Sequence, residues 1–476
     1  MKKAWIAALA ALLLAGLAGA VPGSSSSSTG TQGYLVVLAG TQGADGFTTT
    51  GTAAAINAAI AAAGGTVRND LSQQIGVLYV HSPSATFASA LSGSALVESV
   101  GADFSWQGVA ASAPEPVDDP GEVAQWDMQQ IRTDEAHEIQ GGIPAVDVGV
   151  LDTGIDGQHL DFKKALVSNV ACERGRNSIT FVPGGPGVGT PDPCVDNGFH
   201  GTHVAGTIGA RANGIGLVGV APNVTLVPVK VCDSSGYCYA SAVVDGITYA
   251  GDEKFDVINM SFFVDDNEFQ QSTEFKCMND PVQRSFRLAV ERAIQYARNQ
   301  GVTPVAALGN SDQDLASPRE PYENNCEVVP AETQGVIGTA ALGRQKQKAS
   351  YSNYGVGATD VTAPGGTGTG NCLNAVPSTF PANTYACISG TSMASPHAAG
   401  VAALIVSQFG TLGADGDVKL APTKVEQYLQ STAIDQGLPG YDECFGNGRI
   451  DALRAVTHDT SQAYDATAPY CPEYSE

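Results

Sequence analysis

Three residues able to carry out acyl transfer stand where apolar stretches meet small residues. Asp152 follows the apolar run 146–151, His200 begins the segment His-Gly-Thr-His-Val-Ala-Gly, and Ser392 lies in Gly-Thr-Ser-Met-Ala-Ser-Pro-His. A serine hydroxyl is too weak an acid to attack a carbonyl unaided, so an imidazole must take its proton and a carboxylate must orient that imidazole. Singly, a turn aspartate, a structural histidine and a helix-capping serine are simpler explanations. Together the three predict a nucleophile, a base and an orienting acid.

The elements that must position these residues alternate along the chain after residue 125. The expected buried strands are 146–151, 225–231, 257–260, 303–307 and 336–341, and the expected helices are 202–210, 240–250, 284–299 and an alanine-rich stretch that ends near Ser407. This alternation predicts an α/β fold with a parallel sheet, whose ligand sites lie at the carboxyl ends of the strands. Asp152 is expected at such an end.

A smaller α+β unit precedes this sheet. It shows apolar runs at 35–38, 75–80 and 97–100 and helical patterns at 53–63 and 85–91. The expected division is a signal peptide at 1–20, a flexible Ser/Gly segment at 21–32, the small unit at 33–105, a Pro-rich linker with a processing site at 106–124, the main domain at 125–457 and a tail at 458–476.

The first twenty residues have the pattern of a secretory signal. Lys2 and Lys3 precede an apolar run, and Ala18-Gly19-Ala20 supplies the small residues of a cleavage site. The run is short for a membrane span. We therefore expect a protein that is secreted and has no membrane partner after signal removal.

The excess of acidic residues limits the kinds of partner that the protein is expected to bind. Asp and Glu number 48 against 24 Lys and Arg, which gives a net charge of -24. Nucleic-acid binding relies on basic side chains that neutralise phosphates, so nucleic acid is not an expected partner. The acidic surface is explained by solubility, or by affinity for hard cations such as calcium.

The ten cysteines all lie after residue 171. An even number in an exported protein is typical of disulfides, and zinc is disfavoured because no C-x-x-C pair occurs. Sequence alone leaves the pairing open. Local partners would give Cys172–Cys194, Cys232–Cys238, Cys372–Cys387 and Cys444–Cys471, with Cys277 left for Cys326.

The order Asp, His, Ser differs from that of trypsin-like enzymes and of α/β-hydrolases. With its flanking motifs it resembles the subtilisin family of serine peptidases over residues 125–455. Val305-Ala306-Ala307-Leu308-Gly309-Asn310 resembles that family's oxyanion strand. Further matches are Ser350-Tyr351-Ser352-Asn353-Tyr354-Gly355, Val361-Thr362-Ala363-Pro364-Gly365 and Phe445-Gly446-Asn447-Gly448-Arg449-Ile450.

The resemblance implies a secreted serine endopeptidase that cleaves extended protein or peptide segments and acts as a monomer. It implies that Asp152 orients His200, that His200 serves as base and then acid, and that Ser392 forms the acyl-enzyme. Asn310 is expected to donate to the developing oxyanion beside the backbone N–H of Ser392.

The expected substrate-binding residues lie on two walls. On one wall, Ser261-Phe262-Phe263 stands where the family usually has Ser-Leu-Gly, and an apparent insertion follows at 264–280. A phenylalanine in place of that glycine narrows or reshapes the pocket, and Ala307-Leu308-Gly309 belongs to the same expected set. On the other wall, Ser235-Gly236-Tyr237 forms an edge along which an extended peptide can add as a strand, stiffened by a disulfide between Cys232 and Cys238.

A structural calcium ion is also implied by the resemblance. Asp161 lies nine residues after Asp152, and Asn213 lies thirteen after His200; both offsets fit the family's calcium loop. Oxygen ligands suit Ca²⁺. The expected ligands are Asp161, Arg211, Asn213, Ile215 and Leu217, with Gln125 as a candidate sixth, and the alternative is a glycine-rich loop without an ion. No organic cofactor is expected.

By the same resemblance, the small unit looks like a ferredoxin-like propeptide that assists folding and then inhibits the active site with its C-terminal tail. A permanently retained domain is the alternative. Release is expected between Ala110 and Gln125. Two rival functions are a secreted esterase or lipase, which would require G-x-S-x-G where this chain has Gly-Thr-Ser-Met-Ala, and an inactive peptidase that serves as a binding scaffold.

Overall fold

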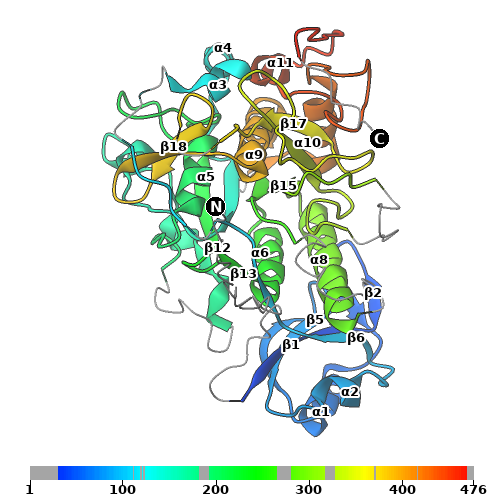
Figure 1. The fold of residues 1–476 in the computed structure, drawn as a ribbon. Coiled ribbons are helices and arrows are strands. Elements are labelled where there is room, and N and C mark those ends of the chain that lie inside the picture. The colour runs from blue at the N-terminus through cyan, green and yellow to red at the C-terminus, as the bar shows by residue number, and fades with distance from the viewer. Residues whose placement is uncertain are drawn as a thin grey trace, which may run out of the picture.

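The computed structural model describes residues 30–468 apart from 111, 118–120, 122–123, 182–191, 265–279, 317–326, 369–370 and 415. Figure 1 shows a small N-terminal unit at one end of a larger α/β unit. The predicted signal peptide and nearly all of the apparent insertion at 264–280 lie outside the described residues. Within the described residues, no helix has the length and apolarity that a membrane crossing requires.

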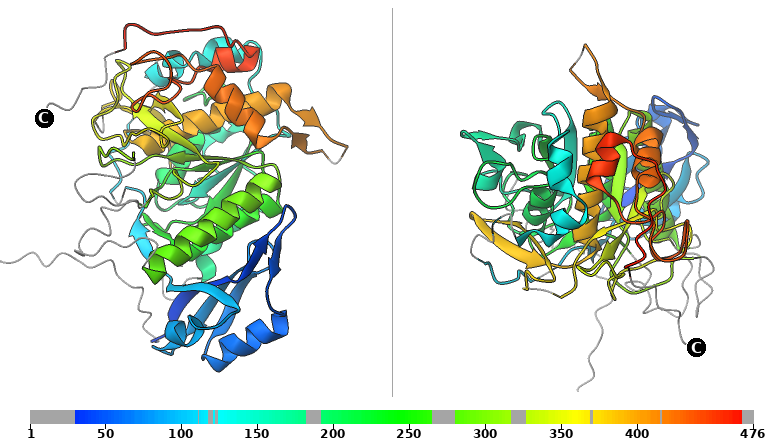
Figure 2. Two further views of the ribbon diagram at one scale, coloured as in Figure 1. Left: turned by 90° about the vertical axis from the view of Figure 1, so that its right-hand side faces the viewer. Right: turned by 90° about the horizontal axis from the view of Figure 1, so that it is seen from above.

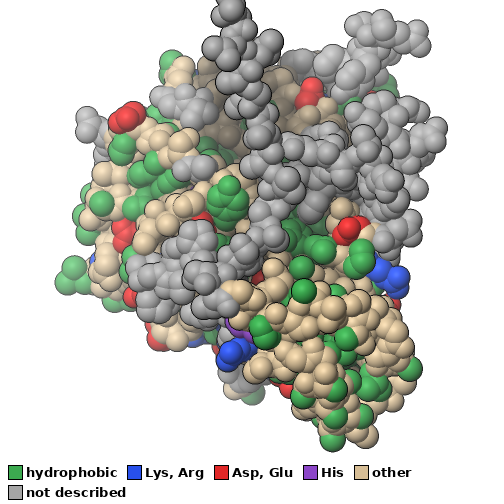
Figure 3. Space-filling model, turned by 60° about the horizontal axis from the view of Figure 1, so that its bottom comes forward, with side chains coloured by type: hydrophobic (Ala, Val, Ile, Leu, Met, Phe, Trp, Pro, Cys, Tyr) green, Lys and Arg blue, Asp and Glu red, His purple; other side chains and the backbone are tan. Residues whose placement is uncertain are grey.

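The small unit is a four-stranded antiparallel sheet with two helices on one face. Its strand order, β4-β5-β1-β6, and its β-α-β-β-α-β succession give the predicted ferredoxin-like topology. Figure 3 looks onto this end of the molecule, where the visible face carries few charged side chains. The elements are β1 (Gln32–Leu38), β2 (Gly40–Gln42), β3 (Phe47–Thr49), α1 (Ala53–Ala62), β4 (Thr66–Leu71), β5 (Val77–Ser82), α2 (Phe87–Leu91) and β6 (Val97–Ala102).

The sheet of the small unit is apolar on both faces. Val36 of β1 packs with Ile56 and Ile60, which lie one turn apart on α1, whereas Leu35 and Val37 belong to the core formed with the larger unit. Successive strand residues point to opposite faces, so β1 contributes to both cores. The small unit is therefore built to lie against the larger one.

The larger unit is organised around a seven-stranded sheet in which neighbouring strands are parallel. In spatial order the strands are β11 (Arg176–Asn177), β12 (Thr225–Lys230), β8 (Asp147–Asp152), β14 (Val257–Met260), β15 (Thr303–Ala307), β16 (Ile337–Leu342) and β17 (Val361–Pro364). Burial on both faces explains their continuous apolar runs. The predicted α/β parallel sheet is confirmed, and each of the five predicted strands agrees to within one residue.

Four helices cover the two faces of this sheet (Figure 1). On one face lie α5 (His200–Gly209) and α9 (Thr391–Phe409), and on the other lie α6 (Ala240–Asp252) and α8 (Pro281–Asn299). Helix α8 begins with Pro281 after Asp280, whose side chain accepts hydrogen bonds from the next free N–H groups.

Shorter elements complete the described chain. They are β7 (Ser105–Gln107), α3 (Trp126–Gln130), α4 (Thr133–His137), η2 (Leu160–Phe162), β9 (Lys163–Lys164), β10 (Val167–Ser168), η3 (Cys172–Arg174), η4 (Ser178–Phe181), β13 (Tyr237–Tyr239), β18 (Val376–Phe380), β19 (Thr384–Ile388), β20 (Thr411–Leu412), β21 (Val418–Lys419), α10 (Pro422–Ser431) and α11 (Ala452–Thr457).

The small unit packs against α6 and α8, as the left view of Figure 2 shows for α8. Ser99 and Ser285 share a buried hydrogen bond of 2.7 Å between their Oγ atoms. Asp103 accepts hydrogen bonds from the backbone N (3.0 Å) and Oγ (2.7 Å) of Ser241 in the first turn of α6. Burial raises the pKa of the Asp103 carboxyl. The contact thus pairs a carboxyl group with the free N–H groups at a helix start.

Three of the predicted disulfides are present, Cys172–Cys194, Cys232–Cys238 and Cys372–Cys387. Cys444 is also disulfide-bonded. Its predicted partner Cys471, and the predicted pair of Cys277 with Cys326, lie outside the described residues.

The described part of the predicted tail packs on the larger unit. The carbonyl of Ala463 accepts a hydrogen bond from Asp435 N at 2.9 Å, and Asp465 forms an ion pair of 2.6 Å with Lys346. His458 stacks on Tyr428.

Candidate active site

Asp152 and His200 form a buried pair at the carboxyl end of β8. His200 is the first residue of α5, and its Nδ1 lies 2.9 Å from each carboxylate oxygen of Asp152. The two side chains are 2% and 0% exposed. Helix α5 approaches the loop after β8 so closely that a Cβ on Gly201 would lie 2.1 Å from the carbonyl of Gly154. This contact requires glycine next to the histidine.

A second buried carboxylate supports this pair. Asp196 accepts hydrogen bonds from Thr153 Oγ1, from the N–H of Gly198, and from both the N–H and Oγ1 of Thr202. Burial is the main cause of the raised pKa of Asp196. The network ties the loop after β8 to the first turn of α5, so Asp196 helps to fix the position of His200. The sequence did not predict this role, because Thr153 and Thr202 approach Asp196 only in the folded chain.

Ser392 lies in the first turn of α9 and is 6% exposed. Its Oγ donates to the carbonyl of Ser261 at 2.9 Å, and the Oγ of Ser261 donates to the carbonyl of Ser392 at 2.8 Å. Asn259 extends the network, because its Nδ2 donates to Ser261 Oγ at 2.8 Å and its Oδ1 accepts from Ser395 Oγ at 2.7 Å. The end of β14 therefore holds the first turn of α9 by side-chain hydrogen bonds.

One cavity of about 260 Å³ brings the predicted residues together. Ser392, His200, Asn310 and Phe263 all line it. The remaining lining residues are Gln107, Gly108, Val109, Ala110, Ile388, Ser389, Gly390 and Met393. The nucleophile, the base and the oxyanion donor expected from the sequence thus face a common space, which the segment after β7 enters.

Asn310 follows β15 and is held by the start of α9. Its Oδ1 accepts hydrogen bonds from the N and the Oγ1 of Thr391, both at 2.9 Å. With Oδ1 engaged in this way, the Nδ2 group remains as the donor of the side chain. The preceding Ala307 and Leu308 are fully buried, and Gly309 donates its N–H to Thr391 Oγ1 at 3.1 Å.

Of the residues expected on the two walls of the substrate cleft, Phe263 lines the cavity, whereas Ser235, Gly236 and Tyr237 are not among its lining residues. Strand β13 pairs with β7 in antiparallel fashion, and Gly236 accepts hydrogen bonds from the N–H groups of Gly108 and Val109. On the opposite wall Phe263 lines the cavity, but Phe262 is fully buried and packs against Trp106. The sequence predicts a linker from residue 106, but Trp106 lies in β7 and pairs with Cys238 of β13. A single tryptophan carries no periodic signal from which this contact could be predicted.

The histidines of the two motifs other than His200 are structural. Nε2 of His203 bonds to the carbonyl of Ala386, and burial lowers the pKa of His203 to about 3. His397 contacts Asp127 through Nε2 at 3.1 Å and the carbonyl of Met393 through Nδ1 at 2.8 Å. Neither lies in the cavity.

The predicted calcium loop gathers its expected side chains. Asp161 is fully buried and accepts from Leu217 N at 2.9 Å. Asn213 Oδ1 accepts from Ile215 N at 3.0 Å, and Gln125 Oε1 accepts from Val218 N at 2.9 Å. Tyr385 also donates to Asp161 Oδ1 at 3.2 Å. Carboxylate and amide oxygens are ligands that hard cations prefer, so the chemistry of the donor set fits such an ion.

The expected ligand set contains a single carboxylate, that of Asp161, which lies in η2. No group of three or more His, Cys, Asp or Glu that could hold a metal occurs among the described residues. A cation here would depend on amide and backbone oxygens, including the carbonyl of Arg211.

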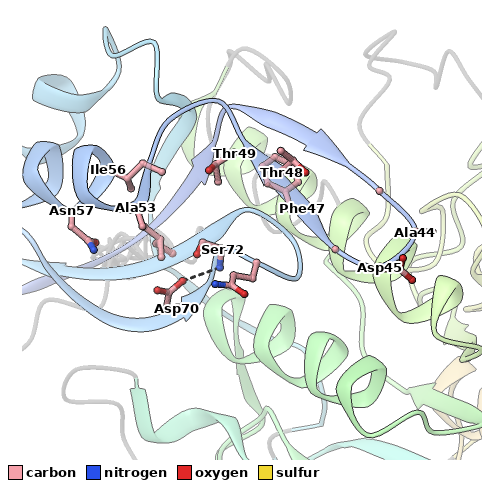
Figure 4. Close-up of a pocket in the computed structure, with 14 residues that line it drawn as sticks. Ala44, Asp45, Phe47, Thr48, Thr49, Ala53, Ile56, Asn57, Asp70 and Ser72 are labelled. Atoms are coloured by element: carbon pink, nitrogen blue, oxygen red, sulfur yellow. Dashed lines mark hydrogen bonds between the residues drawn. The ribbon is translucent and has the colours of Figure 1, made fainter.

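A larger hollow of about 620 Å³ lies in the small unit (Figure 4). It is lined by the hairpin of β2 and β3, the start of α1 and the turn after β4, where Ser72 N donates to Asp70 Oδ1. No histidine lines it, so it does not combine a nucleophile with a base.

The fold and the cavity at Ser392 together define a serine-type peptidase on a parallel α/β sheet. The model of the subtilase family, Peptidase_S8, matches residues 144–448. Subtilisin DY of Bacillus licheniformis is 36% identical over 311 residues, which are 65% of this chain and 90% of that protein. Subtilisin Savinase of Lederbergia lenta is 32% identical over 331 residues, which are 70% of this chain and 98% of that protein.

A solved structure agrees in fold. The epidermin leader peptide processing serine protease (EpiP) of Staphylococcus aureus aligns over 91% of this chain and 99% of its own, with a TM-score of 0.68 and 21% identity. The chain belongs to the subtilase family and is a subtilisin-like serine endopeptidase.

Proposed function

We propose that the chain is the zymogen of an exported endopeptidase in which Asp152, His200 and Ser392 form the catalytic triad. The observation that carries the proposal is the cavity shared by Ser392, His200 and Asn310, with Asp152 bonded to the far nitrogen of His200. A carboxylate at Nδ1 holds the imidazole with Nε2 free to accept a proton.

The geometry supports acyl transfer in two steps. Ser392 Oγ leaves the carbonyl of Ser261, gives its proton to His200 and adds to the peptide carbonyl. His200 then protonates the departing amine, which leaves the acyl group on Ser392. A water molecule gives a proton to His200, attacks the ester and releases the acid, and the proton returns to Ser392.

The Nδ2 group of Asn310 and the backbone N–H of Ser392 are the proposed donors to the oxyanion. Such donors act at full strength only where water is excluded. The burial of Ser392 and of the Asp152–His200 pair supports this.

We also propose that the small unit is an inhibitory propeptide that the enzyme removes by its own activity. What supports this is the course of the chain after β7, because Gly108, Val109 and Ala110 line the cavity beside Ser392. The proposed processing bond lies next to Val109 or Ala110, at or just before the start of the stretch from Ala110 to Gln125 in which the sequence predicts release.

We also propose that the protein is exported and that it binds a structural calcium ion. The signal-like start supports export. A calcium ion held by Asp161, Asn213, Gln125 and the carbonyls of the 211–217 loop would stabilise the fold without taking part in the reaction.

The decisive experiment compares wild type with Ser392→Ala. Ser392→Ala should abolish peptide hydrolysis, remain at the full zymogen mass, and fail to react with a fluorophosphonate. Ser407→Ala is the control, since Ser407 lies in the same helix and bonds to Ala403. Full activity in Ser392→Ala would refute the triad, and a wild type that folds but takes up no fluorophosphonate would favour a binding scaffold.

A further inference from the structure

The segment from Ser105 to Val109 is held on the larger unit by backbone pairing and hydrogen bonds. Trp106 stands opposite Cys238 in the antiparallel pairing of β7 with β13. The N–H of Gly108 donates to the carbonyl of Trp106 at 2.9 Å and to that of Gly236 at 3.1 Å, so the chain turns at Gln107, and Val109 N also donates to the carbonyl of Gly236 at 3.2 Å. Backbone hydrogen bonds of this kind bind any sequence, so the choice of sequence must come from the side-chain positions.

Trp106 fills an aromatic pocket at this edge. It is 3% exposed, and its ring centroid lies 6.4 Å from that of Phe262 and 5.5 Å from that of Phe286. Its Nε1 has no hydrogen-bond partner within the described chain. The indole is therefore held by its shape and apolar surface, and the pocket suits a large aromatic side chain.

Gly108 follows β7 directly and lies two residues after Trp106. A Cβ built on Gly108 would lie 2.5 Å from Cys238 Sγ, 2.9 Å from Trp106 Nε1 and 3.2 Å from Cys238 Cβ. Gly108 does not have the positive φ that favours glycine. The restriction is therefore one of space alone.

The Cys238 sulfur next to Gly108 cannot move away by a change of rotamer. Cys238 is fully buried and bonded to Cys232, six residues earlier. A sulfur fixed by a disulfide on a paired strand lacks the rotamer freedom with which a flexible side chain would make room.

We propose that the Cys232–Cys238 disulfide makes this peptidase select glycine two residues after a large aromatic residue, in substrates of the form aromatic-x-Gly. The segment Trp106-Gln107-Gly108 is the chain's own example of that motif. This inference rests on the proposed endopeptidase function and names its substrate class.

The first test uses the released enzyme, with active sites counted by fluorophosphonate, on quenched peptides that copy residues 104–113. Changing Gly108 to alanine in the peptide should lower kcat/KM by about tenfold or more, and changing Trp106 to alanine should lower it by a similar amount. Changing Ser105 to alanine is the matched control and should alter it by less than about twofold. Equal cleavage of the glycine and alanine peptides would overturn the proposal.

The second test removes the obstacle. In Cys232→Ala/Cys238→Ala the preference for glycine over alanine should shrink to about threefold or less. The control Cys172→Ala/Cys194→Ala should keep the wild-type ratio. If Cys232→Ala/Cys238→Ala keeps the wild-type ratio of kcat/KM between the glycine and alanine peptides, the disulfide is not the cause of the selection. If that variant does not fold, few of its active sites will react with fluorophosphonate. The wild-type enzyme and the peptide series then test the preference for glycine by themselves.

The peptidase function and the glycine selection predict different results for these peptides. If wild type cleaves none of the peptides and behaves like Ser392→Ala on unfolded protein, the proposed function is wrong. If wild type cleaves all four peptides equally well, the peptidase function stands and the glycine selection is wrong.

Discussion

Ser392 and Ser261 exchange hydrogen bonds in both directions, side chain to carbonyl, at 2.9 and 2.8 Å. Ser261 is buried and is held in turn by Asn259. In this structure the hydroxyl of Ser392 donates its hydrogen bond to the carbonyl of Ser261. The hydroxyl of Ser261 donates to the carbonyl of Ser392 and so fixes the backbone at that residue. The second bond therefore positions the nucleophile without touching the substrate.

Ser261→Ala should lower kcat by about tenfold with little change in KM, since one buried hydrogen bond contributes on the order of 1 to 2 kcal/mol. Steady-state kinetics on the released enzyme measures this. Ser395→Ala, which removes only the far end of the network at Asn259, should have a smaller effect. A Ser261→Ala enzyme with an unchanged kcat would show that the turn at Ser392 is rigid without this bond.

Asn310 offers a test that separates donation from anchoring. Asn310→Ala should lower kcat by about 10² to 10³-fold, because it removes a donor to the developing oxyanion. Asn310→Asp retains an oxygen for the N–H and hydroxyl of Thr391 but lacks the amide donor, so it should be similarly slow. Should Asn310→Asp keep wild-type kcat, the residue would be an anchor for α9 only.

Calcium should raise the melting temperature through the 211–217 loop. In the Ser392→Ala background, which avoids self-digestion, a chelator is expected to lower Tm by several degrees, about the effect of 1 to 2 kcal/mol of lost binding. Asp161→Asn should abolish the response to added Ca²⁺. Asp45→Asn, at an exposed position of the small unit, is the matched control. Identical melting with calcium and with chelator would exclude a structural ion here.

Asp256 should make the fold less stable as the pH rises. Burial raises the pKa of this carboxyl from 3.8 to about 7, and its Oδ2 accepts a hydrogen bond from Asp147 N at 2.9 Å. Because the folded pKa exceeds the unfolded value, the stabilisation is complete below about pH 4 and is lost progressively up to about pH 7.

Asp256→Asn keeps the acceptor and removes the ionisation. Measured by denaturant unfolding in the Ser392→Ala background, its free energy of unfolding should match that of the parent near pH 4 and exceed it at pH 8 by on the order of 2 to 4 kcal/mol. A difference that does not change with pH would show that Asp256 is ionised in the folded protein throughout.

The strands of the main sheet could be predicted because burial on both faces leaves an uninterrupted apolar run, as in 257–260 and 303–307. Strand β4 could not, since Arg68, Asn69 and Asp70 interrupt any such run. Its place in the sheet comes from pairing with β5, a long-range contact with no local signature. Strand β17 entered our sequence analysis only as a matched motif, because four residues give too short a pattern.

The residues of the candidate site likewise divide into those with a local sequence signal and those brought together only by folding. Asp152, His200, Ser392 and Asn310 could be predicted because each stands in a motif at an element boundary. Asp196 was missed, since its partners Thr153 and Thr202 converge only in three dimensions. The contacts of Trp106 were missed for the same reason. Proximity without periodicity or a motif requires the folded structure.

Val117 lies beyond the cavity along the chain, and its N–H donates to the carbonyl of Tyr385 at 2.9 Å. Residues 108–110 are therefore tethered on both sides, by β13 before them and by Tyr385 after them. A cut between these tethers is a unimolecular event, whose effective concentration is set by the fold and not by the amount of protein. Dilution would leave the half-life of the intact chain unchanged, whereas the hydrolysis of any free peptide would slow in proportion.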